Sequence, residues 1–152
     1  MSHAMGVRLV HNLTHPSELI IDLTDGPQLV HAIVAVGRRS HLWTARSMGW
    51  GSEAASLIVA GWPPAADVGA PVEFFARGRR SLLPGGCLAV LLPHADPVAA
   101  VELVLAAKQA GLAYLQHIVA IGQSSRGRHR RQLDIHTDVL VVMRPTGGDG
   151  GA

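Results

Sequence analysis

A tryptophan and two prolines end one of the most apolar stretches of the chain, ASLIVAGWPP (55–64). The flat indole of Trp62 offers stacking surface for a planar substrate, and Pro63 and Pro64 stiffen the backbone beside it. These three residues are therefore candidates for a substrate pocket. A rigid packed corner needs the same residue types, and the sequence favours neither interpretation.

A second candidate site follows an earlier apolar run, in ELIIDLTDG (18–26). Gly26 would let a ligand approach the backbone closely, and Asp22 and Thr24 bring hydrogen-bonding side chains to the same turn. We expect either a small-molecule contact here or a plain strand-to-helix turn.

Four arginines crowd one polar segment: Arg126, Arg128, Arg130 and Arg131. Clustered arginines bind nucleic acid phosphates and release counterions, so nucleic acid is a candidate partner. A solvated hairpin loop is the alternative. The interleaved aromatic residues of a single-strand binding platform are absent from this segment.

The histidines and the cysteine predict no metal site. The nine histidines are scattered, without two pairs at zinc-like spacing. His94 and His136 follow and precede predicted strands without an evident catalytic partner, which favours surface roles. Cys87 opens an apolar strand, which predicts a packed, inert thiol. A single cysteine excludes an internal disulfide and fits a reducing compartment.

The composition predicts one globular domain. The chain has 152 residues and a formal net charge of +2, so its bulk charge implies no polyanionic partner. Aromatic residues make up 4%, so the core must be aliphatic. No apolar run reaches the ~18 residues that a membrane span needs, and the start has no signal-peptide character. We expect a cytoplasmic domain over residues 1–145, with no membrane contact, and a disordered tail over 146–152.

Hydrophobic patterning and turn residues divide the chain into strands and helices. The predicted helices are 29–36, closed by Gly37, then 72–83, and 97–111 with Asp96 as its N-cap. On the last helix we expect Val98, Val101, Leu105 and Leu112 to form the buried stripe. The predicted strands are 18–23, 41–44, 56–60, 87–92, 114–121 and 138–143, with 84–86 as a turn before the fourth.

Strands that alternate with helices predict a mostly parallel sheet with helices on both faces. The final two strands are joined by too few residues for a crossover helix with loops, so we expect them to be antiparallel. Ligands on such sheets bind at the carboxyl ends of the strands. A small open sheet with apolar edges also makes a homodimer plausible.

Six segments in this order resemble class I S-adenosylmethionine-dependent methyltransferases, most of all the branch related to amino-methylating DNA methylases. They span about residues 15 to 145: HPSELIIDLTDG, VAVGRRSHLW, SLIVAGWPP, RRSLLPGGCLAVLL, AGLAYLQHIVAI and HTDVLVVMRP. The resemblance implies a three-layer Rossmann-like methyltransferase fold with a mostly parallel sheet and a terminal antiparallel hairpin. Because few residues separate Asp22 from Ser56, it also implies a reduced size, with one strand–helix unit lost or shortened.

The resemblance implies S-adenosylmethionine as cofactor, held by Asp22, Thr24, Gly26 and Thr44. It implies that Trp62, Pro63 and Pro64 line the pocket of the methyl acceptor, which would be a nucleic acid base or a small amine. Four residues depart from the family pattern. Gln28 stands at the position of the expected second glycine and Pro27 precedes it, the second strand ends in Thr44 instead of an acid, and Ala65 stands where a tyrosine is usual.

These departures keep two other functions open. One is a catalytically inactive methyltransferase homologue that serves as a binding or assembly module. The other is a nucleic-acid-binding accessory that uses the arginines of residues 126–131.

Overall fold

The computed structural model describes residues 1–24, 26–42, 54–63, 69–92, 97–120 and 137–147. In these segments no helix combines the length and the apolar character that crossing a membrane requires. The elements in chain order are α1 (His3–Leu13), β1 (Leu19–Leu23), α2 (Gln28–Val36), β2 (Arg39–Leu42), β3 (Ala55–Gly61), α3 (Pro71–Ser81), β4 (Leu82–Leu92), α4 (Pro97–Gln109), β5 (Ala113–Ala120) and β6 (Thr137–Met143).

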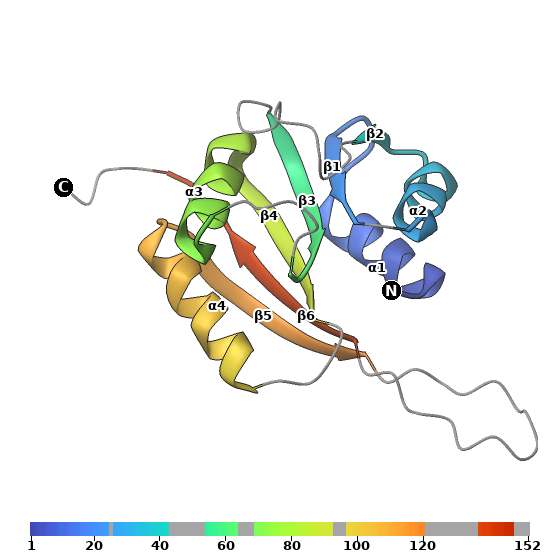
Figure 1. Cartoon of the computed structure of the whole chain (residues 1–152). Helices are drawn as coiled ribbons and strands as arrows, with labels where there is room; N and C mark the ends of the chain where they lie inside the picture. Colours follow the sequence, from blue (N-terminus) through green and yellow to red (C-terminus); the bar gives the residue numbers. More distant parts are fainter. Residues whose placement is uncertain (25, 43–53, 64–68, 93–96, 121–136, 148–152) are drawn as a thin grey trace, which may run out of the picture.

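The strands form one six-stranded sheet in the order β2-β1-β3-β4-β6-β5 (Figure 1). Strands β1 to β4 are parallel, and β6 runs antiparallel between β4 and β5. The expected mostly parallel sheet with a terminal antiparallel hairpin is confirmed. Strand β3 lies at its centre and is apolar except for the buried Ser56, because helices cover both faces of the sheet there.

The helices form two outer layers. Helices α1 and α2 cover one face, where Leu29 and Ile33 pack on Leu57 and Val59. Helices α3 and α4 cover the other face, as Figure 1 shows. The two phenylalanines of the chain, Phe74 and Phe75, both lie on α3 and are fully buried, which stabilises the fold by about 1.5–3 kcal/mol for each side chain.

Of the two helices in the α1–α2 layer, only α2 was predicted from the sequence. Helix α2 ends as expected at Gly37, whose φ of 73° suits the left-handed C-cap. Helix α1 was not predicted from the opening residues. Ser2 caps it by accepting a hydrogen bond from the Met5 amide, and Gly6 lets it approach α2 closely, since a Cβ there would lie 3.1 Å from Cβ of Ala32.

The predicted buried stripe of α4 is wrong for three of its four residues, although the helix itself is present and Leu112, just beyond its end, is buried as expected. Val98, Val101 and Leu105 are 65%, 58% and 54% exposed. The buried face instead carries Ala100, Leu103, Ala106 and Ala107. The smaller side chains face the sheet because they let the helix approach it closely, and the larger ones face outward.

The glycine-rich segment 84–86 lies inside β4 rather than before it. Ala55 of β3 pairs with Leu82 and Leu57 pairs with Cys87, so β4 accommodates the extra residues as an irregularity in the register. Gly85 donates its amide to the Arg144 carbonyl at 2.8 Å, which extends the β4–β6 pairing past the end of β6.

Gly78 gives a test of how tightly α3 packs on the sheet. A Cβ at Gly78 would lie 2.4 Å from Cδ1 of the fully buried Leu88. We therefore expect Gly78→Val to lower the free energy of unfolding by about 1–3 kcal/mol, as overpacking does. Ala76→Val, on a half-buried position of the same helix, is the matched control in urea denaturation. An equal loss in both variants would contradict the close contact at Gly78.

Candidate active site

The ends of β1 and β3 bring the two candidate motifs together. The strands are parallel neighbours, and Leu23 pairs with Ala60 at their carboxyl ends. Thr24 and Gly61 therefore leave the sheet side by side, about 4.8 Å apart in the strand-to-strand direction. The cofactor and acceptor motifs predicted from the sequence thus share one rim of the sheet.

The same rim is the point where the strand order reverses. From β1 the chain continues to β2 on one side, and β3 lies on the other side of β1. Helices α2 and α3 leave toward opposite faces. In open α/β sheets this arrangement opens a crevice at the carboxyl ends of the strands, where ligands bind.

Asp22 organises the turn after β1. The residue is 2% exposed, and its Oδ1 accepts hydrogen bonds from the Thr24 amide at 2.8 Å and the Thr24 hydroxyl at 2.6 Å. A carboxylate that binds the backbone two residues ahead forms an Asx-turn and reverses the chain. Burial raises the pKa of the Asp22 carboxyl above its ordinary value of 3.8, and the two hydrogen bonds from Thr24 offset part of this rise.

The start of α2 brings to the rim amides that have no partner within their own helix. Pro27 is the N-cap residue and provides no side-chain cap, and the first turn has no acidic residue. The amides of Gln28, Leu29 and Val30 cannot bond within the helix, because the first turn of a helix has no preceding carbonyls. Such amides favour an anionic group.

Gln28 covers the glycine of this turn. A Cβ built on Gly26 would lie 2.1 Å from Oε1 of Gln28, so the Gln28 side chain lies across the face of Gly26. Gln28 is exposed and attached through a flexible stem. A ligand can approach Gly26 once this side chain turns away.

Trp62 is fixed at the same rim, just past the end of β3. Its amide donates to the Leu91 carbonyl of β4 at 3.0 Å, and its ring meets the Phe74 ring edge-on at a centroid distance of 5.5 Å. The indole is half-buried, and Pro63, which follows a cis peptide bond, is exposed. Apart from its chain neighbours, no described residue lies within 4 Å of a Cβ built on Gly61. Trp62 is thus both a packed corner and a rim residue.

Other candidate residues lie elsewhere. Cys87 is buried, and burial raises the pKa of its thiol, as expected for an inert packed cysteine. Among the described residues no cluster of three or more His, Cys, Asp or Glu side chains could hold a metal ion. Outside the described residues lie Thr44, Pro64, His94, Arg126, Arg128, Arg130, Arg131 and His136.

The structure adds a pair that the sequence did not predict. His117 of β5 lies with its Nε2 3.1 Å from Oδ2 of Asp138, the second residue of β6. Asp138 is buried, and its Oδ1 has no hydrogen-bond partner. Both side chains lie on the α3–α4 face. Only the pairing of β5 with β6 brings them together, and no local motif signals it.

The sequence matches no protein-family profile and no curated protein, but solved structures match most of the chain. A structure of the complex between the Haloferax volcanii Trm112 methyltransferase activator and a methyltransferase superposes with a TM-score of 0.64 at 11% identity, covering 95% of this chain and 89% of the other. Geranyl diphosphate C-methyltransferase from Streptomyces coelicolor, solved with S-adenosyl-L-homocysteine, gives 0.59 at 11% identity, covering 93% and 78%. The [4+2]-cyclase SpnF gives 0.60 at 14% identity, covering 95% and 81%.

The chain has the class I methyltransferase fold. The matches span nearly all of it, and the described strand order fits a reduced version of that Rossmann-like architecture. At these identities the likeness shows the fold and leaves the reaction open, since the same fold includes a cyclase.

The rim of this methyltransferase fold suits S-adenosylmethionine chemically. The cofactor carries an ammonium and a carboxylate on its amino acid end. The buried carboxyl of Asp22 could receive the ammonium, and the uncapped amides of α2 could receive the carboxylate. The residues present therefore fit the cofactor, provided that Gln28 turns away from Gly26.

The raised pKa of Asp22 predicts a pH-dependent difference in stability between the wild type and Asp22→Asn. The folded state holds this proton more tightly than the unfolded chain, so the stabilising contribution is full below about pH 4 and is lost as pH rises through the folded pKa. Asparagine keeps an acceptor for both Thr24 donors and carries no charge. We expect the melting temperature of Asp22→Asn to gain on the wild type as pH rises from 4 to 7, measured by thermal unfolding. A difference that stays constant over this range would contradict the raised pKa.

Proposed function

We propose that the protein binds S-adenosylmethionine at the carboxyl ends of β1 and β3 and methylates an amine held beside Trp62. The observation that carries the proposal is the pairing of Leu23 with Ala60, since it joins the Asp22 turn and the Trp62 corner at the switch point of a methyltransferase-type sheet. When bound, the cofactor would supply an electrophilic methyl group on a sulfonium: an amine lone pair would attack the methyl carbon as the C–S bond breaks, S-adenosylhomocysteine would leave, and the methylated amine would lose a proton to water.

The residues of the chain would contribute binding and orientation. Asp22 would hold the cofactor ammonium, and Thr24 would keep the Asp22 carboxylate in place through its two hydrogen bonds. Trp62 is fixed by Phe74 and by the Leu91 carbonyl, so its exposed side offers a rigid surface for a planar acceptor. Thr44 and Pro64 belong to this proposal on sequence grounds alone.

The acceptor that we favour is a nucleic acid base or a small amine. The flat ring of Trp62, next to a glycine at the end of β3, suits a planar amine. Nucleic acid would also engage the arginines at 126, 128, 130 and 131, which remain a prediction from the sequence. Binding that weakens steeply with salt and that is lost on replacing Arg128, Arg130 and Arg131 would support the nucleic acid acceptor.

A second candidate function is a binding or assembly module without catalysis. Two observations favour it: the Gln28 side chain lies over Gly26, and Trp62 packs against Phe74. The similar Haloferax volcanii methyltransferase was solved in a complex with a methyltransferase activator, so this fold also binds protein partners.

Calorimetry with S-adenosylmethionine, S-adenosylhomocysteine and sinefungin separates the two candidates. We expect saturable binding with a Kd between about 1 µM and 1 mM, and a loss of roughly tenfold or more in Asp22→Asn, because a charge-assisted contact is removed. Asp138→Asn is the matched control, since it neutralises another buried carboxyl at the same rim three strands away. No heat at millimolar ligand would overturn cofactor binding and leave the assembly module.

A substitution of Gln28 is expected to strengthen cofactor binding, whereas Asp22→Asn is expected to weaken it. Gln28→Ala removes the side chain that lies across Gly26 and keeps a good helix former at the start of α2. We expect it to tighten cofactor binding by several-fold in the same calorimetric titration. His31→Ala, an exposed position on the same helix, should leave the affinity unchanged. Weaker binding in Gln28→Ala would instead make Gln28 a ligand contact.

A further inference from the structure

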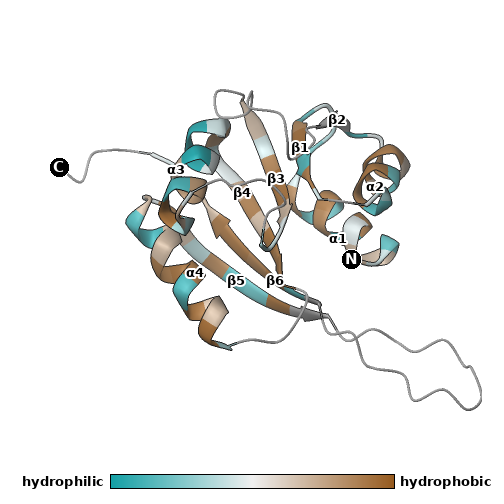
Figure 2. Ribbon diagram, in the orientation of Figure 1, coloured by the Kyte–Doolittle hydropathy of each residue, from teal (hydrophilic) through white to brown (hydrophobic). Residues whose placement is uncertain are grey.

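Exposed hydrophobic side chains gather at one end of the sheet. Seven large hydrophobic residues of the described chain are exposed, and two of them, Val34 on α2 and Leu83 on β4, lie apart. The other five lie on α4 and β5, and we call them the α4–β5 face. In Figure 2, much of α4 has the brown colour of hydrophobic residues. The face comprises Val98, Val101, Leu105, Tyr114 and Leu115.

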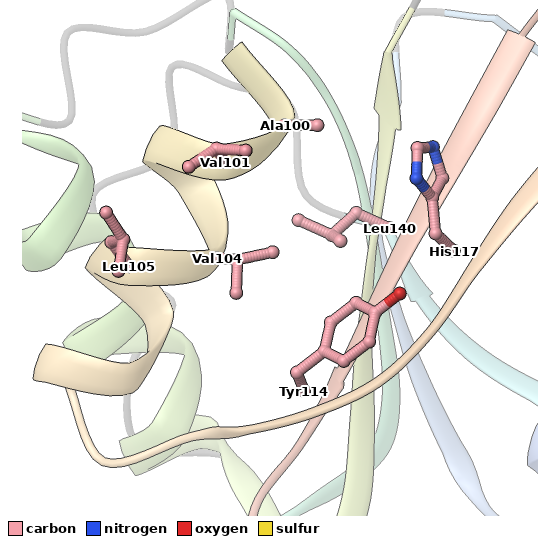
Figure 3. A pocket seen from close by; sticks show the side chains of 7 residues that line it. All are labelled: Ala100, Val101, Val104, Leu105, Tyr114, His117 and Leu140. Atoms are coloured by element: carbon pink, nitrogen blue, oxygen red, sulfur yellow. The ribbon is translucent and has the colours of Figure 1, made fainter. Parts of the chain in front are cut away.

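A groove runs between α4 and β5 beneath this face. It has a volume of about 250 Å³ and is largely apolar. Figure 3 shows the side chains of α4 on one wall and those of Tyr114 and His117 on the other. Its lining residues are Ala100, Val101, Val104, Leu105, Tyr114, His117 and Leu140. Contiguous exposed apolar surface of this kind marks an interaction site.

Strand β5 is an edge strand whose own sequence lacks the usual protection. It ends the sheet order, and its sequence AYLQHIVA has no charged residue and no proline. The opposite edge, β2, has four residues and includes Arg39. Natural proteins protect edges with short strands, charges or prolines, because an open edge pairs with another chain. A register shift between Tyr114 and Gln116 interrupts the first part of β5 and leaves Gln116–Ala120 regular.

The polar groups of the face permit its burial against an identical face. His117 is already paired within its own chain, through Nε2 and Oδ2 of Asp138 at 3.1 Å. On the exposed surface of α4, Glu102 and Lys108 carry opposite charges, which sum to zero. Two copies of this surface would not repel one another, and a strongly acidic or basic partner would gain no net attraction.

We propose that the α4–β5 face binds a second copy of this chain. The β5 strands pair antiparallel over Gln116–Ala120 about a two-fold axis, which joins the two sheets edge to edge. Each α4 then lies beside the other across the seam, where Val101 and Leu105 cover the open groove of the partner. A two-fold contact of this kind is closed, so it yields a dimer and not a fibre. The proposal does not depend on cofactor binding.

Sedimentation equilibrium over micromolar to high micromolar concentrations tests the proposal. We expect a monomer–dimer equilibrium in the wild type. Leu105→Glu and Gln116→Lys each place two like charges in the seam of a dimer, so we expect each to raise the dimer Kd by roughly 100-fold or more. Val34→Glu and Leu83→Glu are matched controls at the two exposed hydrophobic positions outside the face, and both should dimerise as the wild type does.

Tyr114, the only tyrosine of the sequence, gives a second readout at the face itself. Fluorotyrosine labelling yields one fluorine resonance, which should shift with protein concentration in the wild type and stay fixed in Leu105→Glu. Circular dichroism confirms that each variant is folded. A wild type that is monomeric throughout would overturn the proposal, as would dimers that Leu105→Glu and Gln116→Lys leave intact.

Discussion

The parallel pairing of β1 with β3 is the constraint on which the rest of this structure depends. Four residue pairs, from Ile20–Leu57 to Leu23–Ala60, fix where both strands end. A slip of one residue would turn the buried side chains of β1 away from their layers. Because α2 follows β1 on one face and α3 follows β3 on the other, this single register determines where the Asp22 turn, the start of α2 and the Trp62 corner meet.

The same register divides the core into two layers with different roles. The layer under α1 and α2 is purely aliphatic apart from Cys87, and it holds the start of α2 against the sheet. The layer under α3 and α4 contains both phenylalanines, and Phe74 extends it to Trp62 at the rim. The position of the Trp62 ring is therefore set by the packing of α3, so this part of the rim is coupled to the core behind it.

Sequence reasoning succeeded where one local signal decided the structure, and failed where tertiary contacts did. Continuous apolar runs predicted the central strands, and Gly37 predicted the end of α2. Helix α1 has a local signal that was missed, the N-cap Ser2, and the helix is held by close packing of Gly6 on α2. On α4 the larger hydrophobic side chains were predicted to be buried. The buried face instead consists mostly of alanines, because these allow a close approach of the helix to the sheet. The pairing of His117 with Asp138 arises from strands separated in sequence, so no motif could reveal it. The rim position of Asp22, Gly26 and Trp62 was predictable, because parallel strands end at one edge.

Asp22 and Asp138 are both buried where the parallel strands end, and the partners of their side chains differ. Asp138 has His117 as a partner within the chain. Among the described residues, Asp22 receives only the two neutral donors of Thr24, and its raised pKa means that burial opposes its charged form. An asparagine would accept the same two hydrogen bonds without a buried charge, so folding alone does not account for an acid at this position. A cationic group of a ligand at the rim would offset the cost of burying the charge, which is the strongest physical reason to regard the end of β1 as a binding site rather than a turn.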